Sequence, residues 1–314
     1  MTAPNGILVV DKPADWTSHD VVARVRRLAG TRKVGHAGTL DPMATGVLVL
    51  GLGPATRLLT YVVGSDKEYL ATVRIGASTT TDDAEGENLG WAPDDRVRAV
   101  TPRRLADSVA HLTGEIDQVP SSVSAIKVDG KRAYAKVRAG EQVELKARRV
   151  TVSAFDVLDT REASVDGHVV LDVDVRVVCS SGTYVRALAR DLGVALLTGA
   201  HLTALRRTRV GPFELANAHG LGDLAAESPS TAEALIAPAR AAASLFPVLE
   251  LDARQAVDLG HGKRVAVDAE DAPTAAALAP DGRLVGLASV RGGTASVVVN
   301  FPDVQPDVEQ EESR

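Results

Sequence analysis

The sequence predicts an α+β fold followed by a small C-terminal β-barrel, and three observations support this prediction. Apolar residues alternate with polar ones along residues 69–75 and 169–178, the pattern of strands with one buried face. Between Ser18 and Gly30, apolar residues recur instead at helical spacing. From Phe246 onward, short apolar runs are separated by glycine-containing turns, which is typical of small barrels.

The other elements follow from the same signals. Ser18 can cap the first helix, whose buried stripe is formed by Val21, Val25 and Leu28. Residues 76–100 are polar and acidic and predict a loop that adds nothing to the core. Further strands are expected at 7–10, 46–51, 150–158, 248–251, 264–267, 282–290 and 294–301, and further helices at 101–114, at 252–260 and from Thr183.

The loop around Asp41 carries more special residues than a simple turn needs. Three glycines, one proline and His36 surround this single carboxylate, immediately before the apolar run at 46–51. A metal site is poorly supported, because His36 is the only other ligand type between Lys33 and Arg57. A phosphate-binding loop does not fit either, because no Gly-Lys-Ser/Thr follows the glycines. Asp41 could still be a turn residue, a nucleophile or an electrostatic partner.

Four blocks of this sequence resemble, in the same order, the motifs of the TruB family of bacterial tRNA pseudouridine-55 synthases. Gly35-His36-Ala37-Gly38-Thr39-Leu40-Asp41-Pro42-Met43-Ala44-Thr45-Gly46 resembles the catalytic motif of that family. The other three blocks are Gly6–Pro13 with Thr17-Ser18, Lys67-Glu68-Tyr69, and Cys179–Arg186 continuing to Asp191-Leu192-Gly193. The resemblance covers the chain from residue 6 to about residue 213.

The resemblance implies a fold and a division into domains. The fold would be that of the pseudouridine synthases, a mixed, largely antiparallel sheet flanked by helices and loops, with a PUA-like barrel at the C-terminus. The catalytic domain would span 1–245, with an RNA-gripping insertion at about 118–149 and a connector at about 222–245. A PUA-like RNA-binding domain at 246–302 and a disordered acidic tail at 303–314 would follow.

The resemblance also implies a set of site residues. Asp41, Tyr69 and Arg186 would be catalytic, with Tyr69 stacking on the target base and taking part in removal of its C5 proton. Arg186 would pair with Asp41, and a planar guanidinium can hold a carboxylate through two hydrogen bonds. The implied substrate-binding residues are His36, which would fill the space that the base leaves, Leu205 beneath the base, Lys12, Gly38, Thr39, Arg206 and Arg207.

Without the resemblance, several of these residues have ordinary interpretations. Tyr69 and Leu205 would be core residues, and Arg186 would lie on the surface of a helix. Lys12 with Pro13 would form a turn, whereas the resemblance implies a loop that braces the tyrosine strand.

The distribution of charge favours an RNA partner although the net charge is −6. Residues 1–213 contain 28 Lys and Arg against 25 Asp and Glu, whereas residues 214–314 contain 7 against 16. Local positive patches, rather than the total charge, decide phosphate binding. The basic residues form four groups, near 24–33, 127–138, 146–149 and 206–209. The resemblance implies that the partner is the T-arm stem-loop of tRNA, recognised by its folded shape.

The reaction implied by the resemblance is the isomerisation of uridine 55 of tRNA to pseudouridine. The base would leave its stack before the N1–C1′ bond breaks, rotate, and be rejoined through C5. No group is added and nothing is oxidised, so no cofactor or metal is expected. Attack of Asp41 at C1′, attack at C6 and elimination to a glycal remain open, with elimination preferred.

Two other functions deserve weighing. A non-catalytic RNA-binding or tRNA-folding protein could use the same surface, but a paired Asp41 and Arg186 argue against this as the sole role. A nucleoside or glycosyl hydrolase would release free uracil, which the synthase does not. The single cysteine and the absence of a signal segment or long apolar run predict a cytoplasmic protein outside the membrane. We also expect a monomer without an obligate protein partner.

Overall fold

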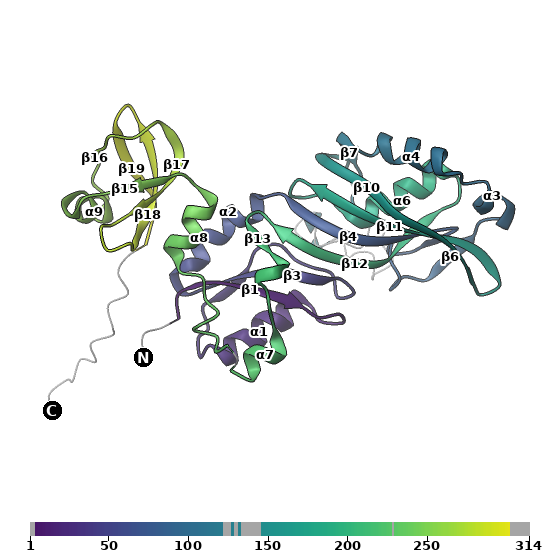
Figure 1. The fold of residues 1–314 in the computed structure, drawn as a ribbon, viewed down its shortest axis with the longest axis horizontal. Coiled ribbons are helices and arrows are strands. Elements are labelled where there is room, and N and C mark those ends of the chain that lie inside the picture. Colours follow the sequence, from purple (N-terminus) through teal and green to yellow (C-terminus); the bar gives the residue numbers. More distant parts are fainter. Residues whose placement is uncertain (1–3, 122–126, 129–130, 133–145, 228, 302–314) are drawn as a thin grey trace.

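A mixed sheet of ten strands forms the larger part of the computed structural model, which describes residues 4–121, 127–128, 131–132, 146–227 and 229–301 (Figure 1). The strands of its main path lie in the order β14-β1-β3-β12-β4-β11-β10-β7. Neighbours are antiparallel except for β1 with β14 and β3 with β12, so the largely antiparallel sheet that we expected is confirmed. The strands are β1 (Gly6–Lys12), β3 (Thr45–Leu52), β4 (Lys67–Ile75), β7 (Gly114–Gln118), β10 (Arg148–Val165), β11 (His168–Cys179), β12 (Ala200–Val210) and β14 (His219–Gly220), with β2 (Val34–His36) beside β3 and β13 (Phe213–Glu214) beside β12.

Helices and short hairpins complete this part of the chain. An apolar core of buried residues joins the sheet to α1, α4 and α6, with valines of α1 and leucines of α6 among its members. These three helices start near the residues at which the sequence places helix starts. The helices are α1 (Ser18–Leu28), α2 (Leu59–Gly64), α3 (Asp94–Arg98), α4 (Pro102–His111), α6 (Val185–Leu196), α7 (Leu221–Ala225) and α8 (Pro238–Leu245). Two 3-10 turns are η1 (Gly53–Leu58) and η2 (Leu215–Asn217). Two short hairpins pair β5 (Ala77–Thr79) with β6 (Asn88–Trp91) and β8 (Lys127–Val128) with β9 (Lys131–Arg132).

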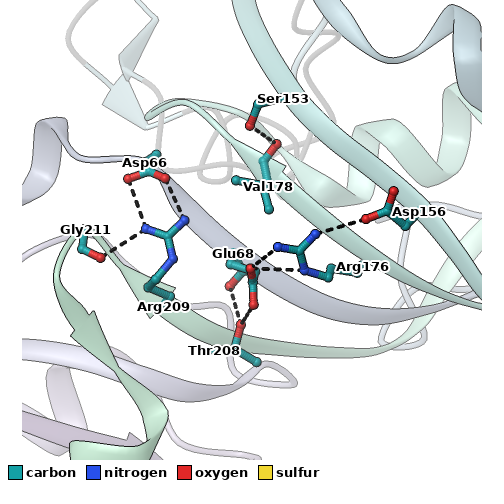
Figure 2. A network of polar contacts seen from close by, with 9 residues as sticks. All are labelled: Asp66, Glu68, Ser153, Asp156, Arg176, Val178, Thr208, Arg209 and Gly211. Carbon is teal, nitrogen blue, oxygen red and sulfur yellow. Dashed lines mark hydrogen bonds and ion pairs between the residues drawn. The ribbon is translucent and has the colours of Figure 1, made fainter.

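The strand β4 shows how alternation divides the sheet into an apolar and a polar face. Tyr69 and every second residue after it to Ile75 are buried in the core. Glu68, Thr72 and Arg74 therefore point to the opposite face, where they bind charged or hydroxyl groups of β11 and β12. Figure 2 shows part of this polar face, where Arg176 lies between Glu68 and Asp156.

Two parts of the large sheet meet where β12 pairs with β3. This parallel contact consists of Arg206 opposite Thr45 and Arg207 opposite Gly46. Gly46 has φ +99°, and a Cβ atom there would lie 2.2 Å from the carbonyl oxygen of Arg207. Only glycine allows the backbones to approach so closely at this φ. The Asp41 loop ends at this junction.

A second sheet follows at the C-terminal end and is curled like a half-barrel. Its strand order is β15-β17-β18-β19-β16, and α8 lies between it and β1 (Figure 1). In this order β15 and β16 form the two edges of the sheet, and its curled shape agrees with the small C-terminal barrel that we expected. The elements are β15 (Val248–Glu250), α9 (Ala253–Gly260), β16 (Val265–Ala266), β17 (Ala272–Leu278), β18 (Leu284–Arg291) and β19 (Thr294–Asn300).

Two local predictions were wrong, and the strands β12 and β17 were not predicted. The cap of α1 is Thr17, which exchanges hydrogen bonds with Asp20, and Ser18 is already helical. Residues 76–100 form β5, β6 and α3 and bury Asp83, so they are more than a polar loop. Strand β17 was missed, because alanine-rich residues have little strand propensity of their own.

Two predicted segments lie wholly or largely outside the described residues. Most of the insertion predicted at 118–149 belongs to them, and so does the tail at 303–314.

Candidate active site

The loop between β2 and β3 holds Asp41 through contacts on both of its sides. The Ser18 hydroxyl accepts from the backbone N–H of Leu40 at 2.9 Å and lies 3.2 Å from the Leu40 carbonyl oxygen. On the other side, the Pro42 carbonyl accepts from the backbone N–H of Asp15 at 3.0 Å. The backbone on either side of the carboxylate is thus bound to the start of α1 and to the turn that precedes it.

Lys12 braces the same loop from β1. Its buried ammonium donates to the carbonyl oxygens of Pro13, Trp16 and Pro42 at 2.8, 2.6 and 3.0 Å. Burial lowers the pKa of Lys12 to about 8, although Asp15 and Asp41 favour the charged form. An ammonium has three donors, and these carbonyls engage all of them. Lys12 therefore supports the Asp41 loop, whereas we expected its own loop to brace the tyrosine strand and Lys12 to bind the substrate.

Arg186 lies between two carboxylates. Its Nε is 3.0 Å from Oδ2 of Asp41, and its Nη1 is 3.2 Å from Oδ2 of Asp83. Nη1 also donates to the carbonyl oxygen of Thr81 at 3.0 Å. The pairing of Arg186 with Asp41 is present, but the guanidinium is shared with Asp83 instead of binding one carboxylate alone.

The protonation of Asp41 depends on this arrangement. Burial raises the pKa of Asp41 above its ordinary value of 3.8, and the neighbouring charge of Asp83 raises it further. Arg186 and Lys12 act in the opposite direction by favouring the carboxylate. The Asp41 side chain nevertheless keeps 37 % of its surface exposed, so it can be reached by another molecule.

A cavity of about 270 Å³ opens beside Asp41. Seven of the ten predicted site residues line it, on four separate segments of the chain: Gly38, Thr39, Asp41, Tyr69, Arg186, Leu205 and Arg207. The other lining residues were not predicted as site residues and are Leu40, Val63, Lys67, Ser181, Gly182, Thr183, Tyr184 and Val185.

Tyr69 and Arg207 form the sheet side of the cavity. They are register partners across β4 and β12 and are both buried. Arg207 donates to the carbonyl oxygens of Val47 at 2.7 Å and Gly38 at 3.1 Å. Burial raises the pKa of the Tyr69 phenol, which keeps its hydroxyl protonated. Arg207 is thus held by the backbone on both sides of the Asp41 loop.

Three predicted residues lie near the cavity but do not line it. Lys12 is buried beneath the loop, as described above. His36 belongs to β2 and packs edge-on against His19, with ring centroids 5.6 Å apart. Burial lowers the pKa of His36, and the neighbouring His19 and Arg207 lower it further. Arg206 points to the other face and binds Asp11 at 2.6 Å.

Two residues that support the site were not among the predicted site residues. Asp83 is 1 % exposed and lies in the segment predicted as a loop. In the sequence Asp83 is one of several acidic residues in this segment, and no feature distinguishes it as a buried residue. Gln118 is also buried, and its amide accepts from the backbone N–H of Tyr184 at 2.8 Å and donates to the Tyr184 carbonyl at 3.1 Å. It thereby holds the start of α6, the helix that carries Arg186.

Lys67 is a second buried lysine, at the rim of the cavity. It donates to the carbonyl oxygens of Val63 and Ser65 at 2.8 and 2.5 Å, at the C-terminal end of α2. Burial lowers its pKa to about 8.

No cluster of three or more potential metal-binding side chains occurs among the described residues. Within the same part of the chain, no helix combines the length and apolar character needed to cross a membrane.

Family models match most of the chain. The N-terminal domain of the TruB family pseudouridylate synthases matches residues 26–185. The tRNA pseudouridylate synthase B C-terminal domain matches 186–244, and the C-terminal domain of tRNA pseudouridine synthase II matches 246–302.

Individual proteins agree with these matches. A tRNA pseudouridine synthase B from Leifsonia xyli subsp. xyli is 60 % identical over 301 residues, covering 95 % of this chain and 97 % of the relative. Another from Arthrobacter sp. (strain FB24) is 57 % identical, covering 95 % and 96 %. Among solved structures, a Cbf5-Nop10-Gar1 complex contains a chain with TM-score 0.69 and 25 % identity, covering 98 % of this chain and 87 % of that one.

The fold and the carboxylate-bearing cavity, together with these matches, define a pseudouridylate synthase. Within that class the chain belongs to the TruB family.

Proposed function

We propose that this enzyme converts uridine 55 in the T-loop of tRNA to pseudouridine. The observation that carries the proposal is the Asp41 carboxylate, which reaches the cavity and lies 3.0 Å from Arg186. The names of the relatives, tRNA pseudouridine synthase B, support tRNA as the substrate. Position 55 is supported by the resemblance of the four motifs to the TruB family.

The reaction is an isomerisation. The N1–C1′ bond of uridine breaks, the uracil rotates in place, and C5 forms a new bond to C1′. C5 then loses its proton and N1 gains one, so atoms and electrons balance without an oxidant or a second substrate. The carboxylate of Asp41 acts at the sugar while the glycosidic bond breaks, and Arg186 keeps it ionised and oriented.

The other residues of the cavity hold the base. Tyr69 offers a buried aromatic ring for stacking, and Leu205 offers an apolar contact on the same side. The target uridine enters as a flipped base, because a stacked base cannot reach a cavity of this kind. The flipped base fills the cavity and leaves water little access to C1′, which favours rejoining of the uracil over hydrolysis.

Binding of the tRNA rests on shape and on the phosphate backbone. T-loop recognition reads the folded loop, and basic side chains supply the sequence-independent part of the affinity. The proposal includes action as a monomer in the cytoplasm. The chain has a single cysteine, so it cannot form an internal disulfide framework, which agrees with a reducing compartment.

The test uses an unmodified tRNA transcript labelled in uridine. Wild type and Asp41→Asn are incubated with it, the products are digested and separated, and the modified position is mapped. We expect pseudouridine at position 55 from the wild type only. As a control, Asp66→Asn removes a carboxylate that binds Arg209 on the polar face and should leave the product unchanged.

Other products would contradict the proposal in different ways. Free uracil would identify a hydrolase. Tight binding of the transcript without pseudouridine from either protein would identify an RNA-binding or RNA-folding protein. Pseudouridine at another position would confirm the chemistry and overturn the target.

A further inference from the structure

A β-bulge interrupts β12 directly behind the cavity. Arg207 pairs with Tyr69 of β4, and Arg209 pairs with Glu68, so Thr208 is the extra residue on β12. A bulge of this kind turns a side chain away from the regular alternation and is common beside active sites. Arg207 itself keeps the regular alternation and shares the cavity face with Leu205; the bulge begins at the next residue and sets the backbone geometry on the C-terminal side of Arg207.

Side chains on the polar face hold the bulge in place, as Figure 2 shows. The hydroxyl of Thr208 donates to Oε1 of Glu68 at 2.9 Å, with the Glu68 carbonyl oxygen 3.3 Å away. The other carboxylate oxygen of Glu68 accepts from Nη2 and Nε of Arg176 at 2.6 and 3.1 Å. The Glu68 side chain is 22 % exposed, so these bonds are partly shielded from water. Glu68, Thr208 and Arg176, here called the bulge clamp, thereby join β4, β12 and β11.

Arg207 connects the bulge to the Asp41 loop, which lies on the opposite face of the sheet. Its guanidinium binds the Gly38 carbonyl oxygen at the start of the loop, and its backbone packs against Gly46 at the end. A Cβ at Gly46 would meet three backbone atoms of Arg207 within 3.0 Å. Both ends of the loop that carries Asp41 therefore contact Arg207, the residue that directly precedes the bulge.

We infer that the bulge clamp is a positioning device for catalysis: Thr208, Glu68 and Arg176 fix Arg207, and through it the Asp41 carboxylate, without touching the substrate. The inference rests on the proposed function. Its physical basis is that a displacement of about 1 Å at a reacting group can cost on the order of 100-fold in rate. The clamp acts on the chemical step and leaves the binding of tRNA unchanged.

The test measures single-turnover rates on unmodified tRNA with enzyme in excess, together with tRNA affinity and unfolding midpoints. Thr208→Val removes the hydroxyl at nearly constant volume, and Thr208→Ser keeps it. Glu68→Gln weakens the bond to Arg176 independently of Thr208. Asp66→Asn is the control, because Asp66 binds Arg209 on the same face, beside the clamp but outside it (Figure 2).

We expect Thr208→Val and Glu68→Gln to lower the single-turnover rate about tenfold or more, with tRNA affinity within about twofold of wild type. Thr208→Ser and Asp66→Asn should stay within about twofold of the wild-type rate. The double variant Thr208→Val/Arg207→Lys should lower the single-turnover rate by less than the product of the two single reductions. Both changes affect the same contact, that of Arg207 with the Asp41 loop.

Two results would overturn the inference. One is a Thr208→Val rate equal to that of Thr208→Ser. The other is a loss of tRNA affinity that accounts for the whole loss of rate. An inactive wild type would refute the proposed function and the inference together, whereas an active wild type with an unaffected Thr208→Val refutes the inference alone.

Discussion

At the scale of single residues, the site depends on carboxylates and cations that share partners. Asp41 and Asp83 both bind Arg186, and Lys12 lies below the backbone of Pro42. The sequence marked Asp41 through its unusual loop and Arg186 through a motif. Asp83 had no such mark, because its burial follows from contacts with Arg186 of α6 and Leu202 of β12, which only the folded chain brings together.

Asp83→Asn should move the acid limb of the pH–rate profile toward lower pH. Catalysis needs ionised Asp41, whose pKa lies above the ordinary 3.8 partly because of the Asp83 charge. Removing that charge lowers the Asp41 pKa, so the carboxylate stays ionised at more acidic pH. Single-turnover rates measured against pH test this. Asp82→Asn, which changes a carboxylate bound to Arg190, should leave the limb in place, and an upward shift with Asp83→Asn would contradict the assignment.

Lys12→Met should destabilise the protein and slow the reaction. The change keeps the buried stem but removes the Lys12 donor from three carbonyl oxygens, of which Pro42 keeps the bond from Asp15, at a cost of about 1–3 kcal/mol in the free energy of unfolding. Urea unfolding measures this loss. Lys33→Met, at an exposed position of the neighbouring segment, should change the free energy of unfolding by less than about 0.5 kcal/mol. Equal stability of the two variants would show that the Lys12 contacts add nothing.

At the scale of elements, alternation predicted the strands that have one buried face, such as β4 and β11. Elements without such an alternating pattern are harder to predict from the sequence. Strand β17 is rich in alanine, and its place between β15 and β18 comes from pairing and from burial of Ala275, Ala276 and Ala277. The cap of α1 was assigned one residue late, because Thr17 and Ser18 are both good capping residues and only the folded structure uses Ser18 to hold Leu40.

Gln118→Met should lower kcat more than it changes KM for tRNA. Gln118 lies at the end of β7 and holds both backbone groups of Tyr184, and α6 has no side-chain cap of its own. Methionine preserves the volume and removes both bonds, so the first turn of α6 and Arg186 lose their support. Steady-state kinetics test this expectation. Gln255→Met, which breaks a glutamine–backbone bond in the C-terminal sheet, should affect stability without lowering kcat. Equal effects on kcat would argue that the Gln118 contact is merely structural.

At the scale of the whole molecule, one apolar cluster joins the two sheets. It contains Ile7 and Val49 of the large sheet and Leu287 of the C-terminal sheet, together with alanines of α8. Burial of this kind couples the unfolding of its parts, because neither side can expose its apolar surface alone without cost.

Leu287→Ala should lower the stability of the entire chain, in one transition, by about 2–5 kcal/mol. The variant leaves a cavity in the shared cluster, so strands of both sheets should lose protection together. Denaturant unfolding followed by hydrogen exchange measures this. Val257→Ala, at a position that is 57 % exposed, serves as the control. Two separate transitions, with the large sheet unaffected, would mean that the sheets unfold independently.

By itself, the sequence determined the α+β class, the strands with alternating faces, the residues of the Asp41 loop and the candidate partners Tyr69 and Arg186. These follow from local periodicity and from motifs, which are properties of short segments. Only the tertiary structure decided that Arg186 is shared with Asp83, that Lys12 supports the loop, and that Arg207 contacts both ends of it. Such contacts join residues that are far apart in the chain, so they depend on strand register and packing, which no local pattern specifies.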